Sequence, residues 1–196
     1  MSYSRIFTAA LLAVMLSACQ GFTAIKPDQR ITVAGRVAVS PQVMWAKPTG
    51  SGISDAVWTI DGFGLNELHF LMGKKPGDRL FNIRGSGRDD FPVVKKGMLP
   101  NDAMDLVVNS LTRLGNAQVR SSGLAPAPFG QPDAGFRFEL NYVNADGLEM
   151  RGVALGAQRN DMVDVLLFIA PNEYYFEKLR DTVDRLFQSV EPLAQS

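Results

Sequence analysis

Glu67 and His69 are the residues of this sequence that most resemble a catalytic pair. They lie two residues apart in a stretch with strand-like alternation, so both side chains project from one face. A carboxylate that orients an imidazole is the usual arrangement of a general base. The sequence places no serine or thiol nucleophile beside this pair, and an exposed polar sheet face explains the same two residues.

Asp164 and the segment 85–90 are the other places where charged side chains suggest chemistry. Asp164 interrupts the apolar run 162–170, where a buried carboxylate acts as an acid or simply pairs with an arginine or a backbone donor. Segment 85–90 (GSGRDD) lacks the Gly-Lys-Ser/Thr ending of a phosphate loop and the spacing of an EF-hand. We interpret it as a solvated loop. The sequence therefore assigns no catalytic residue, no metal ligand and no cofactor.

Aromatic and basic residues in the predicted loops give the best candidate for a contact surface. Trp45 and Trp58 flank the Pro/Gly-rich segment 47–52, and tryptophan is frequent at binding hot spots. Arg88 and Phe129 lie in the two longest predicted loops. We expect these four residues to contact a partner; the alternative is that the tryptophans belong to the core.

Composition excludes several classes of function. The 196 residues include 20 Lys plus Arg and 20 Asp plus Glu, so the formal net charge is zero. A neutral chain has no basic face for DNA or RNA and no strong attraction to anionic lipid. There is a single cysteine, Cys19, and a single histidine, which excludes an intramolecular disulfide and a Cys-based zinc site.

The N-terminus has the three parts of a bacterial export signal. Arg5 supplies the positive charge, and the apolar run 6–16 is too short for a helix that spans a bilayer. Leu16-Ser17-Ala18-Cys19 follows, and it resembles the bacterial lipobox at every position. We therefore expect residues 1–18 to be a signal peptide, 19–29 a lipidated tether and 30–196 one globular α+β domain.

The lipobox resemblance implies how the protein reaches a membrane. The thiol of Cys19 receives a diacylglyceryl group, a dedicated peptidase cuts before it, and two or three acyl chains make a durable anchor. Gln20 follows the cysteine, whereas an aspartate there tends to retain lipoproteins at the inner membrane. The resemblance favours the outer membrane, with the domain facing the periplasm.

Periodicity predicts the remaining elements. Strands are expected at 31–39, 56–60 and 66–72, a helix at 101–114, and long loops at 84–99 and 121–135. Residues 136–142 and 148–157 alternate as a hairpin, which we align with Tyr142 opposite Leu148 and Glu139 opposite Arg151. Gly152, Ala154 and Gly156 share one strand face, on which a helix has room to pack closely.

The last elements close the predicted domain. Residues 162–170 are apolar on both faces and therefore predict a central strand with helices on both sides of the sheet. Asn172 is a good N-cap for a final amphipathic helix. From Phe136 to Val190 the pattern resembles the C-terminal half of the PsbP-like α/β/α sandwich, and the exported part is also similar to uncharacterised proteobacterial envelope proteins.

The fold class expected is α+β, with a mostly antiparallel twisted sheet and helices packed on its faces. The PsbP-like resemblance implies a binding or assembly role without shared catalytic residues. We expect a non-catalytic envelope lipoprotein that contacts an envelope protein, lipid or polymer. The alternatives are a periplasmic carrier of a small ligand or lipid, and a hydrolase that uses His69.

Overall fold

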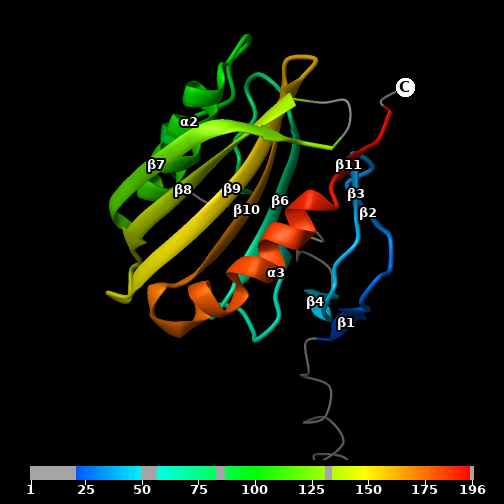
Figure 1. Cartoon of the computed structure of the whole chain (residues 1–196). Helices are drawn as coiled ribbons and strands as arrows, with labels where there is room; N and C mark the ends of the chain where they lie inside the picture. The colour runs from blue at the N-terminus through cyan, green and yellow to red at the C-terminus, as the bar shows by residue number, and fades with distance from the viewer. Residues whose placement is uncertain (1–20, 50–56, 83–86, 131–133, 195–196) are drawn as a thin grey trace, which may run out of the picture.

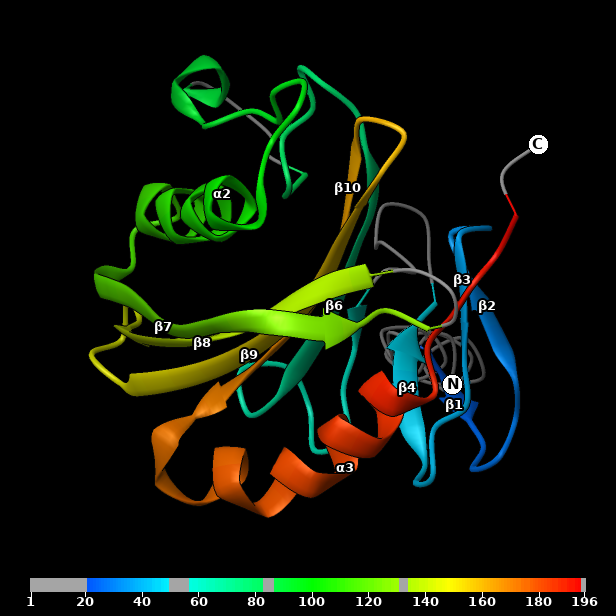
Figure 2. The same ribbon diagram turned by 45° about the horizontal axis from the view of Figure 1, so that its top comes forward.

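The computed structural model describes residues 21–49, 57–82, 87–130 and 134–194. A six-stranded antiparallel sheet forms its centre, in the order β5-β6-β10-β9-β8-β7. Helix α2 covers one face of this sheet and helix α3 the other (Figures 1 and 2). The elements of this α+β sandwich are β5 (Val57–Trp58), β6 (Glu67–Lys74), α2 (Pro100–Arg113), β7 (Ala117–Pro128), β8 (Ala134–Val143), β9 (Glu149–Arg159), β10 (Met162–Pro171) and α3 (Glu177–Gln188). The predicted fold class is confirmed.

Strand β10 is central because its side chains are apolar on both faces. Leu166 and Phe168 join the core under α3, whereas Val165 and Leu167 join the core under α2. Each such side chain contributes about 1.5–3 kcal/mol when fully buried. The prediction of a strand covered on both sides is confirmed.

Two small sheets lie beside the α3 face. Strand β1 (Phe22–Ile25) pairs with β4 (Trp45–Pro48), and β2 (Ile31–Val33) and β11 (Glu191–Pro192) flank β3 (Val37–Val39). Ile25 is buried in the core, so this segment is part of the folded domain. The expected tether 19–29 is therefore wrong over β1, while residues 19 and 20 lie outside the described part.

The segment 31–39 is a hairpin and not the single strand that was predicted. Ala34 and Gly35 have φ of 52° and 65°, the left-handed conformation, in the three-residue loop 34–36 between the paired residues Val33 and Val37. The turn reverses the chain, and Arg36 lies at its end with only 7% of its surface exposed. Composition alone does not distinguish two three-residue strands from one longer strand.

The β8–β9 hairpin has a different register from the predicted one. Tyr142 pairs with Met150 and Asn141 with Arg151, a shift of two residues from the predicted partners. A shift by two keeps every side chain on its predicted face, so hydrophobic patterning could not detect the error. Glu139 and Arg151 still form an ion pair, at 3.4 Å, but diagonally.

Strand β7 occupies most of the predicted loop 121–135. It pairs with β8 along its length, with irregularities at residues 117–120 and 122–125 that break the alternation of its side chains. As an edge strand with mostly exposed side chains, it needs no apolar pattern. Prolines 126 and 128 are tolerated because edge strands have one unpaired side.

The final helix begins four residues later than predicted. Asn172 does not cap it; residues Asn172–Phe176 (η3) form a wide turn, and α3 begins at Glu177. Within that turn Tyr174 has φ 69° and ψ −59°, close to γ-turn geometry, which is strained for a bulky residue. Helix α2, by contrast, matches its prediction to within one residue.

Aromatic side chains, and not a helix, pack against the small residues of β9. A Cβ on Gly156 would lie 2.6 Å from Cζ of Phe136, which shows that an aromatic ring of β8 occupies this space. The expectation of close helix packing is wrong because large β8 side chains fill the face that the small β9 residues leave open.

Candidate functional site

The predicted aromatic contact surface is buried. Trp45 and Trp58 are each 1% exposed and Phe129 is 0% exposed. The ring of Trp58 lies 4.6 Å from that of Phe70, inside the core on the α3 side of the sheet. These three residues therefore stabilise the fold, and the prediction that they contact a partner is wrong. Arg88 lies in a short 3₁₀ helix, Arg88–Asp90 (η2), and its side chain is outside the described part.

Asp164 is the centre of a buried ion cluster. Its carboxylate accepts hydrogen bonds from Arg36 Nε (2.6 Å), from the Gly73 amide (2.7 Å) and from Arg159 Nη2 (2.9 Å). Burial opposes ionisation, but these donors hold the pKa of Asp164 below its ordinary value. A paired, ionised carboxylate is not a general acid, so Asp164 has the structural role that was the alternative interpretation.

The Glu67–His69 pair forms as the spacing suggested. His69 Nε2 lies 2.9 Å from Glu67 Oε2, and the imidazole meets the ring of Phe81 edge-on. Burial opposes ionisation of Glu67, yet the adjacent imidazole of His69 and a hydrogen bond from the Gly64 amide keep the pKa of Glu67 below its ordinary value. Among the described residues no hydroxyl or thiol is hydrogen-bonded to the imidazole, so the pair lacks a nucleophile.

Segment 85–90 is described only from residue 87. There Asp89 forms an ion pair with Arg79 at 3.1 Å. No group of three potential metal-binding side chains occurs within residues 21–49, 57–82, 87–130 and 134–194.

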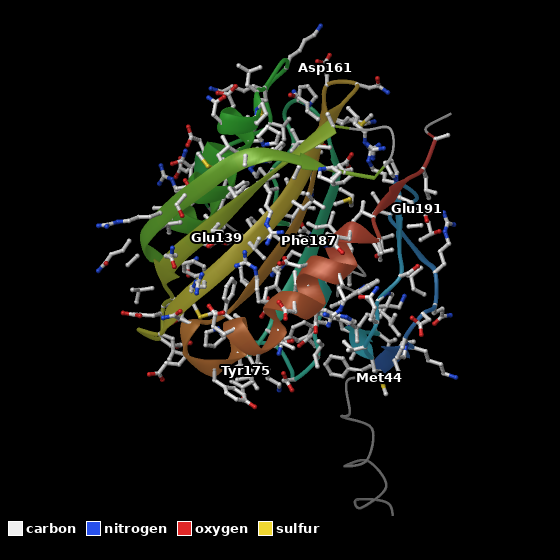
Figure 3. All side chains as sticks on the ribbon, viewed as in Figure 1. Met44, Glu139, Asp161, Tyr175, Phe187 and Glu191 are labelled. Carbon is white, nitrogen blue, oxygen red and sulfur yellow. The ribbon has the colours of Figure 1, made fainter. Side chains whose placement is uncertain are left out.

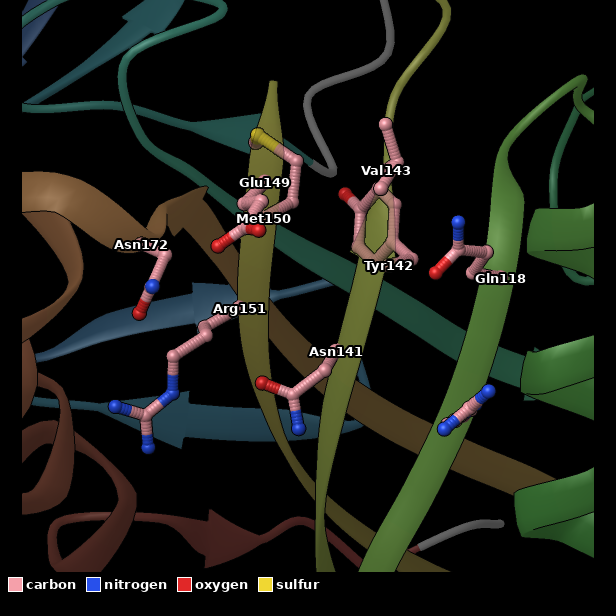
Figure 4. A pocket seen from close by; sticks show the side chains of 9 residues that line it. Gln118, Asn141, Tyr142, Val143, Glu149, Met150, Arg151 and Asn172 are labelled. Carbon is pink, nitrogen blue, oxygen red and sulfur yellow. The ribbon is translucent and has the colours of Figure 1, made fainter. Parts of the chain in front are cut away.

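A polar pocket of about 220 Å³ lies where β7, β8 and β9 end beside the η3 turn (Figure 4). Arg120, Asn141 and Arg151 are cross-strand partners on these three neighbouring strands, so they form one row across the sheet. Directly opposed side chains on paired strands lie roughly 5 Å apart at Cβ. We call these three residues the Arg120 row. Gln118 and Asn172 add further amides to the lining.

The two guanidinium groups of the row differ in their surroundings. Arg151 pairs with Glu139 and Glu177, and its guanidinium lies 4.3 Å from the centre of the Phe176 ring. Arg120 is exposed and forms no ion pair with any residue in the described part of the chain. Glu149 is the single carboxylate among the lining residues, so with Arg151 already paired the guanidinium of Arg120 is the lining cation that remains available to a ligand. Guanidinium groups bind carboxylates and phosphates with two hydrogen bonds, and side-chain amides add donors.

The sequence could not reveal this pocket. Arg120 comes just before the segment 121–135, which was predicted to be a loop. Gln118 has a positive φ of 54° and lies at a register shift of β7, so the side chains there do not alternate as in a regular strand. The row also depends on the register of β8 against β9, which the sequence misplaced by two residues. No motif or spacing joins residues 120, 141 and 151 before the strands are paired.

A second pocket, of about 540 Å³, separates α2 from the segment 91–98. Its lining combines apolar side chains, including Phe91, Met98 and Leu106, with the charged residues Lys95 and Asp105. The volume is within the usual range of small-molecule sites.

Comparison with known proteins adds a likeness of fold. No protein-family profile matches the chain, and no curated protein sequence matches it significantly. The solution structure of cyanobacterial PsbP (CyanoP) from Synechocystis sp. PCC 6803 is similar with a TM-score of 0.48 and 11% identity, over 90% of this chain and 95% of that chain.

LpqN, described as involved in cell envelope biogenesis of Mycobacterium tuberculosis, is similar with a TM-score of 0.39 and 10% identity, over 91% of this chain and 87% of that chain. Both are likenesses of fold at low sequence identity. Within the described residues, no helix combines the length and hydrophobicity needed to cross a membrane.

Proposed function

We propose that the protein is a lipid-anchored component of the bacterial envelope whose domain binds an acidic group on a partner through the Arg120 row. The observation that carries the binding role is Arg120 itself, an exposed guanidinium without an ion pair among the described residues, placed in a pocket. The lipobox at residues 16–19 supports the anchor, and Gln20 supports the outer membrane with the domain in the periplasm.

The pocket's chemistry suits binding better than turnover. Its lining offers guanidinium and amide donors, together with the phenol of Tyr142. Burial, and then the negative charge of Glu67, raise the pKa of Tyr142 well above its ordinary value, so this phenol remains protonated. A site with several fixed donors and one carboxylate recognises a partner carboxylate or phosphate without changing it.

Site-specific photo-crosslinking in intact cells tests this proposal. A photo-reactive amino acid replaces Gln118, which lines the pocket beside Arg120, in one variant and Arg113, an exposed arginine of α2, in the matched control. We expect a defined adduct from position 118 only, with a partner that carries carboxylate or phosphate groups, and we expect Arg120→Gln to abolish it. Equal adducts at both positions, or a neutral or basic partner at position 118, would contradict the proposal.

A second candidate function, a carrier of a small ligand, is favoured by the pocket beside α2. Its volume and its mixture of apolar and charged lining residues are typical of small-molecule sites. A thermal-shift screen of small amphiphiles tests it, because a ligand that binds the native state raises the melting temperature. A shift that Leu106→Trp abolishes by filling the pocket would support the carrier, and the absence of any shift would dismiss it.

A further inference from the structure

The predicted lipid joins the chain three residues before strand β1. Only Gln20 and Gly21 separate Cys19 from strand β1. At 3.3–3.6 Å per residue, the three steps from Cys19 to Phe22 span no more than roughly 11 Å. Strand β1 is held by pairing with β4, and the Thr49 amide donates to the Gly21 carbonyl at 2.8 Å. An acyl chain on Cys19 therefore brings this end of the domain to the bilayer surface.

This end of the domain carries a group of exposed apolar side chains. Phe22 is 50% exposed, Phe63 is 45% exposed, and their rings lie 5.8 Å apart. Leu65 follows in the same turn. Figure 3 labels Met44, a further exposed side chain, and Tyr175 at the end of the molecule where β1 lies. Exposed apolar surface gathered in one place marks an interaction site more often than scattered residues do.

An ion pair and two cation–π contacts of Lys178 extend this group to the start of α3. Asp61, in the turn that carries Phe63, forms an ion pair with Lys178 at 3.4 Å. The Lys178 ammonium lies 5.3 Å from the ring centre of Tyr174 and 5.7 Å from that of Tyr175. We call Phe22, Phe63, Leu65, Tyr174, Tyr175 and Lys178 the aromatic end face.

The backbone holds these side chains outward. Tyr174 is 67% exposed at the strained turn before α3, where φ is 69°. The turn with Phe63 and Leu65 is fixed by Asn66, which is 1% exposed, accepts from the Ile60 amide at 2.7 Å and donates to Asp61 at 3.0 Å. These buried hydrogen bonds hold the backbone of the turn that carries Phe63 and Leu65.

The composition of the face matches a lipid headgroup region. Tyrosine has an apolar body and a polar tip, and aromatic rings are enriched where the hydrocarbon core meets water. A lysine with an apolar stem extends its ammonium to the polar side of that boundary. Because Lys178 is already paired with Asp61, contact with a bilayer does not require anionic lipid.

We propose that the aromatic end face lies on the bilayer that anchors Cys19, with Phe22, Phe63 and Tyr174 at the headgroup level. This inference rests on the proposed lipid anchor. It orients the domain so that α3 begins at the membrane and the edge strand β7 is directed away from it (Figure 1).

Fluorescence quenching in reconstituted vesicles tests the orientation. Because lipid occupies the thiol of Cys19, a cysteine introduced elsewhere can be labelled alone. Leu65→Cys and Leu124→Cys are matched, since both leucines are 37% exposed, and Leu124 lies on β7. The lipidated protein is labelled with an environment-sensitive dye and placed in phosphatidylcholine vesicles that contain a nitroxide lipid.

We expect several-fold greater quenching at residue 65 than at residue 124. A second matched pair, Phe63→Cys and Leu114→Cys, with 45% and 44% exposure, should give the same contrast. Lipidated protein with equal quenching at both members of each pair would overturn this inference alone. Protein whose Cys19 carries no lipid, shown by intact mass, would overturn the proposed anchor and this inference with it.

Discussion

Arg36 and Asp164, separated by 128 positions in the chain, form a two-pronged ion pair in the interior. Arg36 Nε donates to Oδ1 at 2.6 Å and Nη2 donates to Oδ2 at 2.7 Å. The pair joins the hairpin of β2 and β3 to the central strand β10. It explains why an otherwise apolar strand contains a carboxylate.

Replacing Asp164 by Asn should destabilise the domain by about 3–5 kcal/mol, because it leaves the buried guanidinium of Arg36 without its counter-charge. Urea unfolding at pH 7 measures the difference. Asp181→Asn, an exposed change on α3, is the matched control and should stay within about 0.5 kcal/mol. Similar stabilities for the two variants would refute the structural role of the ion cluster.

The same cluster predicts a dependence of stability on pH. The pKa of Asp164 is lower in the folded state than in the unfolded state. Its ionisation therefore contributes fully to the free energy of unfolding above the unfolded pKa of about 3.9, and this contribution is lost as the pH falls through the folded pKa. The stability gap between the wild type and Asp164→Asn should therefore be largest near neutral pH and narrow below about pH 4. A gap that stays constant from pH 7 to pH 3 would argue against this ionisation.

Gly73→Ala should be markedly more destabilising than Gly77→Ala. Both glycines have positive φ, 64° and 91°, so the backbone cost of an alanine Cβ in this conformation, about 1–2 kcal/mol, is shared. A Cβ at residue 73 would lie 2.8 Å from Cδ of Arg36, whereas nothing lies within 4 Å of one at residue 77. Thermal unfolding of the two variants isolates the steric effect. Equal melting temperatures would show that the Arg36 side chain moves away from the added methyl group without loss of stability.

Arg120→Gln should leave stability within about 0.5 kcal/mol of the wild type, because Arg120 is exposed and unpaired among the described residues. Arg180→Gln is the informative comparison, since Arg180 pairs with Glu139 at 2.6 Å and with Asp184 at 3.4 Å. We expect it to cost about 1 kcal/mol after allowance for partial solvent screening. Urea unfolding measures the free energy of unfolding of both variants. A large loss of stability in Arg120→Gln would assign that residue a structural role.

Gly156→Ala should destabilise the domain by about 1–3 kcal/mol, the usual range for overpacking. The added methyl group would lie 2.6 Å from the Phe136 ring. Combining it with Phe136→Leu should recover part of the loss, because the smaller side chain leaves room. Thermal denaturation of the single and double variants measures the coupling, and strictly additive effects would show that the two sites do not touch.

Elements with strong patterning were predictable from the sequence. Helix α2, the β8–β9 hairpin and the apolar strand β10 all stand where alternation or helical periodicity placed them, because burial dictates their residues. Strand β7 was not predictable, since an irregular edge strand with exposed side chains has no periodic signal. The γ-turn at Tyr174 likewise follows from tertiary packing and from no local preference.

The candidate site likewise contains contacts that the sequence predicts and others that it does not. The Glu67–His69 contact and the Glu139–Arg151 ion pair follow from residues that share one face of the sheet, and both are present. The burial of Trp45 and Trp58 depends on β4 and β5 being covered by other elements, which composition cannot reveal. The Arg120 row depends on register across three strands, and that information exists only in the folded sheet.

Intact-mass analysis of the protein purified from its native membrane tests the anchoring claim most directly. We predict a chain that begins at Cys19 and carries diacylglyceryl and acyl groups on that residue. A chain that retains residues 1–18, or that begins at Cys19 with an unmodified thiol, would contradict the account.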